Sequence, residues 1–195
     1  KSVTQDQNIL DIMDRIINNE KFLLYYNYLV QENEKYNLTN ITEKEEAYIK
    51  HFYDSIQLEQ VVDLNTINSI CDVGSGAGFP SIPLKIMYPD LEVTIIETLG
   101  KRVTFLNELA KTLGIEINAI HARAEECSHL RESFDFVTAR AVANMPLLCE
   151  LCIPLVRVGG KFIVMKGLSG KEELNESKKA LRVLSIINCI VCGYV

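Results

Sequence analysis

The sequence predicts an α/β fold: a mostly parallel, Rossmann-like sheet with helices on both faces and a helical N-terminal extension. From Ile67 onward, short β-branched segments alternate with segments of helical periodicity, which is typical of a parallel sheet covered on both faces. Up to about residue 60, apolar residues recur only at helical spacing. We therefore expect a helical extension over residues 1–60 and an α/β domain over residues 61–195.

The extension is expected to contain three helices. Apolar residues between Ile9 and Ile17 follow the i, i+3, i+4, i+7, i+8 spacing of an amphipathic helix. A second helix is predicted from about Lys21 to Tyr36, with Phe22, Tyr25, Tyr26 and Leu29 on its apolar side. Thr42 followed by Glu45 matches a capping box, which predicts that the third helix starts there.

The α/β domain is predicted to alternate strands and helices, with a further strand within Ser185–Val195. The other predicted strands are Ile67–Val73, Glu92–Glu97, Ile115–Ile120, Phe134–Ala139 and Lys161–Lys166. The predicted helices are about Ser81–Tyr88, Lys101–Leu113, Met145–Arg157 and Glu172–Leu184. Ligands of open parallel sheets bind at the carboxyl ends of the strands, so we expect the functional residues there.

The composition limits the classes of protein to consider. The chain of 195 residues is 48% hydrophobic and 24% charged, which is ordinary for a globular protein. Its net charge of −6 argues against nucleic-acid binding by bulk charge but leaves a local basic patch open. The six cysteines show no disulfide-framework spacing and no signal-like segment opens the chain, so we expect a cytoplasmic protein. No apolar run is long enough to span a bilayer, and we expect a monomer without a membrane partner.

The most informative stretch runs from Asp72 to Pro80 and reads DVGSGAGFP. It joins a predicted strand to a predicted helix, so its glycines let the backbone approach a ligand beside the unpaired N–H groups of a helix start. A dinucleotide fingerprint has the spacing G-x-G-x-x-G. Here Gly74 begins the motif, but Phe79 replaces the third glycine and would obstruct a pyrophosphate.

The charge of this stretch narrows the ligand further. Asp72 places a carboxylate at the strand end, which also disfavours phosphate. A cationic nucleoside without phosphate suits the loop better, and S-adenosyl-L-methionine is such a molecule. A glycine turn without any ligand is the alternative, because short motifs carry false positives. A nicotinamide dehydrogenase is least favoured, because Phe79 breaks the fingerprint.

Polar residues at the other strand ends complete a candidate site. Glu97 ends the second strand, 23 residues after Gly74, where an acid can bind ribose hydroxyls; the alternative is a solvated carboxylate capping the next helix. Ala124 and Glu125 follow the third strand, where a short turn would place them beside an adenine. Arg140, at the end of the fourth strand, has a fork of donors suited to a base edge, a carboxylate or a phosphate.

Basic residues also gather at these strand ends. They are Lys101, Arg102, Arg123, Arg140 and Lys166. Together they would concentrate positive charge on one rim of an acidic protein, and that rim could hold RNA phosphates. We expect Lys101, Arg102 and Lys166 to be RNA-binding residues.

Two other patterns, the cysteine pairs and a histidine–aspartate spacing, have simpler explanations than a functional site. Two C-x-x-C pairs, one beginning at Cys149 and one at Cys189, suggest zinc, but a helix and a strand are the wrong contexts, so we expect no metal. His51 and Asp54 lie one turn apart on a predicted helix. They could contact RNA, but we favour a buried hydrogen-bonded pair that joins the extension to the sheet.

Taken in order, these segments resemble the bacterial glucose-inhibited division protein B family of 16S ribosomal RNA guanine-N7 methyltransferases. The resemblance covers about residues 36–167. The segments that carry it are Asn37-Leu38-Thr39, His51-Phe52-Tyr53-Asp54-Ser55, Asp72 to Pro80 with Ile82-Pro83-Leu84, Glu97 to Arg102, Phe105-Leu106, Arg123 to Glu126, Arg140-Ala141 and the strand from Gly160 to Gly167.

The resemblance implies a class I S-adenosyl-L-methionine-dependent methyltransferase fold of seven strands. It implies cofactor contacts at Gly74, Phe79, Glu97, Ala124, Glu125 and Arg140. It also implies that Arg140 orients the reacting groups. The chain departs from the family pattern at Ser81, where glycine is frequent and where we expect serine to be tolerated at a helix start. We also expect the final strand to be missing from residues 61–195.

The function expected from these observations is methyl transfer to N7 of a guanine in 16S ribosomal RNA or the small ribosomal subunit. Two alternatives remain open. One is a methyltransferase that uses the same cofactor on another substrate, a small molecule or a protein. The other is a non-catalytic RNA-binding or assembly protein, against which the intact glycine loop and Glu97 argue.

Overall fold

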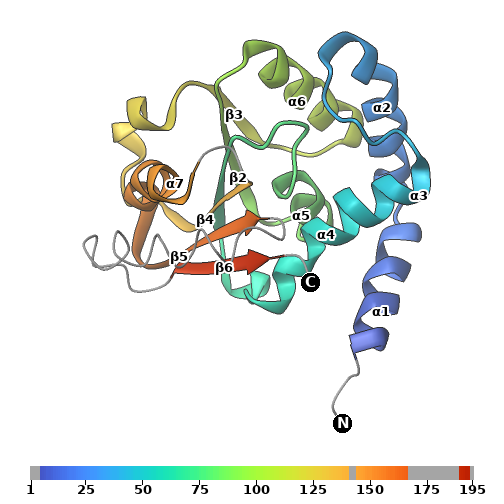
Figure 1. Ribbon diagram of the computed structural model, residues 1–195, viewed down its shortest axis with the longest axis horizontal. Helices are drawn as coiled ribbons and strands as arrows, with labels where there is room; N and C mark the ends of the chain where they lie inside the picture. Colours follow the sequence, from blue (N-terminus) through green and yellow to red (C-terminus); the bar gives the residue numbers. More distant parts are fainter. Residues whose placement is uncertain (1–4, 141–143, 167–188, 194–195) are drawn as a thin grey trace.

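A computed structural model describes residues 5–140, 144–166 and 189–193. These residues form one six-stranded sheet in the order β3-β2-β1-β4-β5-β6, and every neighbouring pair is parallel (Figure 1). This is the order of a doubly wound Rossmann-type fold, in which the direction of winding reverses between β1 and β4. The predicted fold class is therefore confirmed, with six strands in the described part of the chain rather than the seven that the resemblance implies.

Apart from the last, each predicted strand ends within one residue of its observed end, but the starts differ: the strand predicted over Lys161–Lys166 begins five residues early, at Val156, where its pairing with the preceding strand continues across a register shift. The strands are β1 Ser69–Val73, β2 Glu92–Glu97, β3 Asn118–His121, β4 Phe134–Arg140, β5 Val156–Lys166 and β6 Cys189–Gly193. The strand predicted over Ile115–Ile120 begins three residues late, because Gly114 ends the preceding helix in the left-handed conformation (φ 66°) and the chain must then turn into the sheet. The strand expected within Ser185–Val195 is β6.

The helices of the α/β domain are α5 Ser81–Met87, α6 Gly100–Leu113 and α7 Met145–Cys152. The prediction of one helix over Met145–Arg157 is wrong at its end: a 3-10 turn follows at Ile153–Leu155, and β5 begins at Val156. Pro154 explains the difference, because proline has no N–H for the helix and its ring clashes with the preceding turn. The helix predicted over Glu172–Leu184 lies outside the described residues.

The first two helices of the extension are α1 Gln5–Ile17 and α2 Glu20–Tyr36. Asn19 caps the second helix by accepting a hydrogen bond from the Lys21 N–H (3.0 Å), and Asn37 ends it with φ 49°. Both are residue types that favour these cap positions, because their short amides bond to the backbone and tolerate the left-handed region.

The predicted capping box is wrong. Helix α3 runs over Lys44–Ala47, its N-cap is Glu43, and no side chain caps it. The residue before the N-cap of α3 is instead held by α2, because the Tyr26 hydroxyl donates a hydrogen bond to the Thr42 carbonyl (2.6 Å). The chain continues directly into a π-helical turn, Tyr48–Tyr53, and then into α4, Asp54–Ile56.

Two hydrophobic clusters cover the two faces of the sheet. One packs α5 and α6 together with residues of the extension such as Tyr25 and Phe52. The other packs α7 against residues of the strands, including Cys71 and Phe162. In Figure 1, α7 lies on one side of the strands, whereas α2, α5 and α6 lie on the other. The extension therefore shares its core with one face of the sheet, and the division at residue 60 stays a prediction.

Candidate functional site

The candidate site lies at the carboxyl ends of β1 and β4, where the strand order reverses. The loop after β1 contains the three glycines, and Arg140 is the last residue of β4. The register pairs Asp72 of β1 with Thr138 of β4, so the glycine loop and Arg140 leave the sheet side by side. A reversal of this kind opens a crevice between the two loops, which is the usual ligand site of such folds.

The glycine loop has a conformation that other residues would not adopt easily. Gly74, Gly76 and Gly78 have φ values of 73°, 62° and 100°. L-residues rarely enter this region, so the glycines fix the path of the loop. The Gly74 N–H donates to the Ile96 carbonyl (2.8 Å), and the Gly78 N–H donates to the Ser75 carbonyl (3.1 Å). The loop is thereby tied both to β2 and to itself.

The two sides of this loop differ. A Cβ atom added at Gly76 would meet nothing within 4 Å, so this side of the loop is open. A Cβ atom added at Gly78 would lie 2.6 Å from the Ile82 side chain and 2.7 Å from the Tyr25 hydroxyl. Gly76 therefore borders space that a ligand can enter, whereas Gly78 is needed for packing against the extension.

Phe79 is buried between two rings that the extension supplies. Its ring stacks on Tyr25 (centroids 5.3 Å apart) and on His51 (4.3 Å). The Tyr25 hydroxyl also donates to the Ala77 carbonyl (2.5 Å). Burial and the nearby Arg140 cation lower the pKa of His51 to about 4, so this ring is neutral at neutral pH. The ring that replaces the third fingerprint glycine thus belongs to the core, and a contact of Phe79 with the cofactor stays a prediction.

Glu97 is buried, so the alternative of a solvated carboxylate is wrong. It is 2% exposed and lies at the end of β2. Its carboxylate accepts hydrogen bonds from the N–H groups of Gly76 (3.1 Å) and Thr98 (3.1 Å). An acid held this way at the open side of the glycine loop is placed to accept further hydrogen bonds from a ligand's hydroxyl groups.

The short turn expected after β3 is present as a 3-10 helix, Ala124–Glu126. Ala124 is buried, whereas the side chain of Glu125 is exposed and lies 3.7 Å from Arg123. Glu126 accepts from the Arg123 N–H (3.2 Å), which fixes the start of the turn. Their predicted contacts with an adenine stay predictions.

Arg140 pairs with an acid from the extension. Its Nη2 lies 3.0 Å from Oδ2 of Asp54, whose side chain is only 6% exposed, whereas that of Arg140 is 24% exposed. Asp54 is the first residue of α4, so this pair joins the extension to the sheet. The link is made by Asp54 with Arg140 and not by the expected pair of His51 with Asp54, since His51 Nε2 bonds to Thr39 Oγ1 (2.9 Å). The Arg140 side chain is therefore partly buried and ion-paired, rather than freely solvated.

The other expected basic residues contribute unequally to a positive rim. Arg102 lies 3.7 Å from the buried Glu97 carboxylate, and Arg123 faces Glu125. Lys101 is exposed at the start of α6. Lys166 is the last residue of β5. Acids therefore offset part of the charge of this rim, and RNA binding by Lys101, Arg102 and Lys166 stays a prediction.

Several buried polar atoms beside the glycine loop have no partner among the described residues. They are Asp72 Oδ1, Ser75 Oγ, Ser81 Oγ and Thr138 Oγ1. Leaving such an atom unsatisfied costs about 1–3 kcal/mol, so a cluster of them points to a bound ligand or to ordered water. Polar acceptors of this kind, together with the open side at Gly76, fit a polar nucleoside such as S-adenosyl-L-methionine.

Asp72 lies at the centre of this cluster. It is fully buried, and its Oδ2 accepts from the Ser81 N–H (3.2 Å), so serine at this helix start is accommodated as expected. Burial raises the pKa of Asp72 to about 7, although the Ser81 hydrogen bond and Arg140 act in the opposite direction. A nearby cation would favour the ionised form of this carboxyl group.

The cysteine pairs lie in the contexts that were expected. Cys149 and Cys152 are buried on α7, and Cys189 and Cys192 belong to β6. Burial raises the pKa of Cys152, which disfavours the thiolate that zinc requires. Within the described ranges, no three His, Cys, Asp or Glu side chains are arranged to hold a metal ion. Among the helices that the structure describes, none is both long and apolar enough to cross a membrane.

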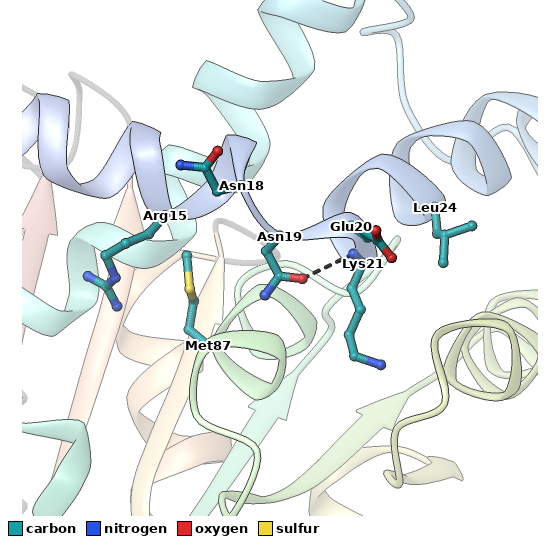
Figure 2. A pocket seen from close by; sticks show the side chains of 7 residues that line it. All are labelled: Arg15, Asn18, Asn19, Glu20, Lys21, Leu24 and Met87. Carbon is teal, nitrogen blue, oxygen red and sulfur yellow. Dashed lines mark hydrogen bonds between the residues drawn. The ribbon is translucent and has the colours of Figure 1, made fainter.

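Two cavities lie away from the glycine loop. One of about 570 Å³ is lined by Arg15, Asn18, Asn19, Glu20, Lys21, Leu24 and Met87 (Figure 2). Its cations are already bound, because Arg15 pairs with Glu59 (2.6 Å) and Lys21 Nζ donates to the Leu113 carbonyl (2.5 Å). Another, of about 210 Å³, lies between the Ala124–Glu126 turn and α7. Neither cavity reaches the glycines of the loop.

Sequence reasoning did not predict the contacts between residues that lie far apart in the chain. Tyr25 was assigned only to the apolar side of a helix, yet its hydroxyl holds the glycine loop. The pairing of Asp54 with Arg140 joins residues 86 positions apart, and no spacing rule links them. The signal that the sequence offered was that His51 and Asp54 lie one turn apart on a predicted helix.

The fold and this site define a class I methyltransferase. Among solved structures, the fold resembles a ribosomal protein L11 methylase from Lactobacillus delbrueckii subsp. bulgaricus, with a TM-score of 0.54 and 16% identity over 69% of this chain and 67% of that one. It also resembles the PH0226 protein from Pyrococcus horikoshii OT3, with a TM-score of 0.54 and 17% identity over 76% of this chain and 71% of that one. At these identities the likeness concerns the fold alone.

Sequence comparison identifies the family. The chain belongs to the GidB family, rRNA small subunit methyltransferase G, whose profile matches residues 18–193. It is 54% identical over 169 residues to the ribosomal RNA small subunit methyltransferase G of Bacillus subtilis, which covers 85% of this chain and 71% of that protein. A Staphylococcus epidermidis protein of the same name is 53% identical over 168 residues, 85% of this chain and 70% of that protein. The resemblance found in the sequence is confirmed.

Proposed function

We propose that this protein transfers a methyl group from S-adenosyl-L-methionine to N7 of a guanine in 16S ribosomal RNA, acting as a monomer in the cytoplasm. The observation that carries the proposal is the 54% identity with a named small-subunit ribosomal RNA methyltransferase over 85% of the chain. The substrate is thus expected from the family, and the site geometry supports the cofactor.

The residues around the glycine loop fit the parts of the cofactor. Glu97, buried and oriented by backbone N–H groups, would accept hydrogen bonds from the ribose hydroxyls. The open side of Gly76 would let the backbone pass close to the ligand, with Gly74 at the base of the loop. Ala124 and Glu125 would border the adenine. Asp72 would supply negative charge beneath the cationic end of the molecule.

The chemistry places few demands on acid or base residues. The bound cofactor supplies an electrophilic methyl group on a positively charged sulfur. Guanine N7 carries a lone pair and no proton, so direct in-line attack needs no general base. The task left to the protein is positioning, which is a large part of catalysis in reactions that join two molecules. Arg140, beside the loop at the end of β4, is our candidate for orienting the reacting groups.

The ribosomal RNA would be held by the rim of the strand ends. Lys101 and Arg102 lie in the first turn of α6, and Lys166 ends β5; their contacts would be to phosphate groups. Such contacts depend on salt, so binding should weaken as ionic strength rises. The overall negative charge would limit binding of RNA elsewhere on the surface.

A transfer assay tests the proposal. The purified protein is incubated with labelled S-adenosyl-L-methionine and either naked 16S RNA or small subunits from a strain that lacks its own family member. We expect label in the RNA and 7-methylguanine after nuclease digestion. Label in protein or in small molecules alone would favour another substrate. Cofactor binding by calorimetry without any transfer would exclude the proposed enzyme, and RNA binding without cofactor binding would favour an assembly protein.

A further inference from the structure

We propose that Asp54 is a positioning residue for the methyl-transfer reaction. Its carboxylate holds the guanidinium of Arg140 at the acceptor side of the site, so that the N-terminal extension takes part in catalysis. The inference rests on the proposed function and deepens it. The carrying observation is the ion pair between α4 and the end of β4, with 3.0 Å between Arg140 Nη2 and Asp54 Oδ2.

The burial of the two partners differs in a way that suits this role. The Asp54 side chain is 6% exposed, so it is fixed in the interior, whereas that of Arg140 is 24% exposed. A guanidinium has five N–H donors in a rigid plane, so one carboxylate can fix its orientation while the group also reaches a ligand. An arginine without such an anchor would sample several rotamers, and only some of them would face the substrate.

The segment that carries Asp54 is held firmly. It follows the π-helical turn Tyr48–Tyr53 directly, and π-turns inside helices often occur at functional sites. Ser55 is buried and its hydroxyl donates to the His51 carbonyl (2.6 Å). The His51 ring in turn stacks on Phe79 of the glycine loop. The extension therefore contacts the cofactor loop through His51 and the acceptor side through Asp54, within one turn of helix.

The charge of Asp54 has a second consequence for the reaction. In methyl transfer the N7–C bond forms as the S–C bond breaks, the bonding electron pair stays on sulfur, and the positive charge passes to the guanine. A guanidinium beside the acceptor would oppose this shift of charge. The carboxylate of Asp54 offsets that cation without removing its donors, because opposite charges at hydrogen-bonding distance screen each other's field.

A purely structural ion pair predicts something different. If Asp54 only tied the extension to the sheet, its loss would lower stability and leave the rate of transfer unchanged. If it positions Arg140, its loss lowers kcat, while the affinity for the cofactor changes little, because the other expected cofactor contacts lie in the glycine loop, at the end of β2 and in the turn after β3 and do not depend on Asp54. The separation of kcat from cofactor Kd is therefore the readout that distinguishes the two roles.

The experiment uses Asp54→Asn, which keeps the shape of the side chain and removes its charge. Single-turnover transfer to 16S ribosomal RNA gives the rate, calorimetry gives the Kd for S-adenosyl-L-methionine, and thermal melting monitors the fold. We expect a rate at least tenfold below that of the unaltered protein and a Kd within twofold. Asp54→Glu, which restores the carboxylate, should transfer methyl groups at least threefold faster than Asp54→Asn.

Glu59→Gln is the matched control. Glu59 also forms an ion pair with a residue of the extension, Arg15 (2.6 Å), away from the glycine loop, so its loss should lower the melting temperature without changing the rate.

An unchanged rate in Asp54→Asn, or a loss of rate fully explained by weaker cofactor binding, would overturn the inference alone. If Asp54→Asn does not fold, Asp54→Ser serves in its place as a second variant without the charge, and an unchanged rate in folded Asp54→Ser would overturn the inference. An unaltered protein that methylates no RNA would instead overturn the proposed function itself.

Discussion

The cofactor side and the acceptor side of the candidate site are built in different ways. The cofactor side is a contiguous loop, Asp72 to Pro80, whose glycines and strand-end acid are spaced as a motif. The acceptor side depends on Arg140 and Asp54, which are 86 residues apart and meet only in the folded chain. Local chemistry thus determines where the cofactor would bind, and the helical extension determines how the acceptor side is shaped.

Replacing Arg140 by Ala tests the acceptor side and should have the largest effect. We expect transfer to 16S ribosomal RNA to be abolished while the protein remains folded, because Arg140 lies at the end of a strand and its side chain is partly exposed. Circular dichroism and a methyl-transfer assay measure the two quantities. A folded Arg140→Ala protein with normal activity would remove Arg140 from the site.

Replacing Gly78 by Ala tests the packing side of the cofactor loop. The residue has φ 100°, and a Cβ atom would lie 2.6 Å from Ile82 and 2.7 Å from the Tyr25 hydroxyl. Strain and overpacking together should lower the free energy of unfolding by about 2–4 kcal/mol. Gly76→Ala is the control, since φ is 62° and space is open there; it should cost only about 1 kcal/mol. Urea unfolding measures both variants. Equal losses of unfolding free energy in Gly78→Ala and Gly76→Ala would contradict the difference between the two sides of the loop.

Replacing Glu97 by Gln tests the ribose contact. The amide keeps the size of the side chain but loses the charge, and hydrogen bonds to charged groups are worth about 1.5–3 kcal/mol, so cofactor affinity should fall about 10- to 100-fold. Calorimetric titration with S-adenosyl-L-methionine measures the change. An affinity equal to that of the unaltered protein would mean that Glu97 only orders the loop through its bonds to Gly76 and Thr98.

Asp72 gives the stability of the free protein a pH dependence. Because burial raises its pKa from 3.8 to about 7, the native state keeps the proton longer than the unfolded chain does. This contribution is present below about pH 4 and is lost as the pH rises through about 7, by on the order of 1–4 kcal/mol. Urea unfolding from pH 5 to 8 should show the decline, and Asp72→Asn should flatten it. A decline of equal size in Asp72→Asn would mean that other groups cause the pH dependence of stability.

The smallest effect is expected on the opposite face of the sheet. Cys152→Ala removes a buried thiol that packs with α7, so the free energy of unfolding should fall by about 1 kcal/mol, with transfer activity unchanged. Metal analysis of the unaltered protein should give no stoichiometric zinc, and chelation should leave activity intact. Stoichiometric zinc that is lost in Cys152→Ala would reverse our interpretation of the cysteine pair.

Most of the fold could be predicted from periodicity because each element carries its own pattern. The segment Glu92–Glu97 was predicted with its observed bounds, since its four consecutive β-branched residues, Val93 to Ile96, stand between segments that do not continue the pattern. The errors arose where a local rule competed with tertiary contacts or with proline. Thr42 matched a capping box but is held by Tyr26, and Pro154 ended a helix that apolar spacing alone would have prolonged.

The site could be predicted only on its cofactor side. Gly74 and Glu97 were found because a fixed spacing along the chain reflects two neighbouring strand ends. The positions of Tyr25 against Ala77 and of Asp54 against Arg140 depend on how a helical extension packs on the sheet. No periodicity encodes that packing, because aromatic residues on a helix look the same whether they support a loop or only fill a core.

The central claim is tested most directly by mass spectrometry of 16S ribosomal RNA. Small subunits from cells that lack this protein are compared with the same subunits after incubation with the purified protein and S-adenosyl-L-methionine. The account predicts that one 7-methylguanine is absent before incubation and present afterwards, and that it does not appear with Arg140→Ala. Ribosomal RNA that keeps its full complement of 7-methylguanine in cells lacking the protein would contradict it.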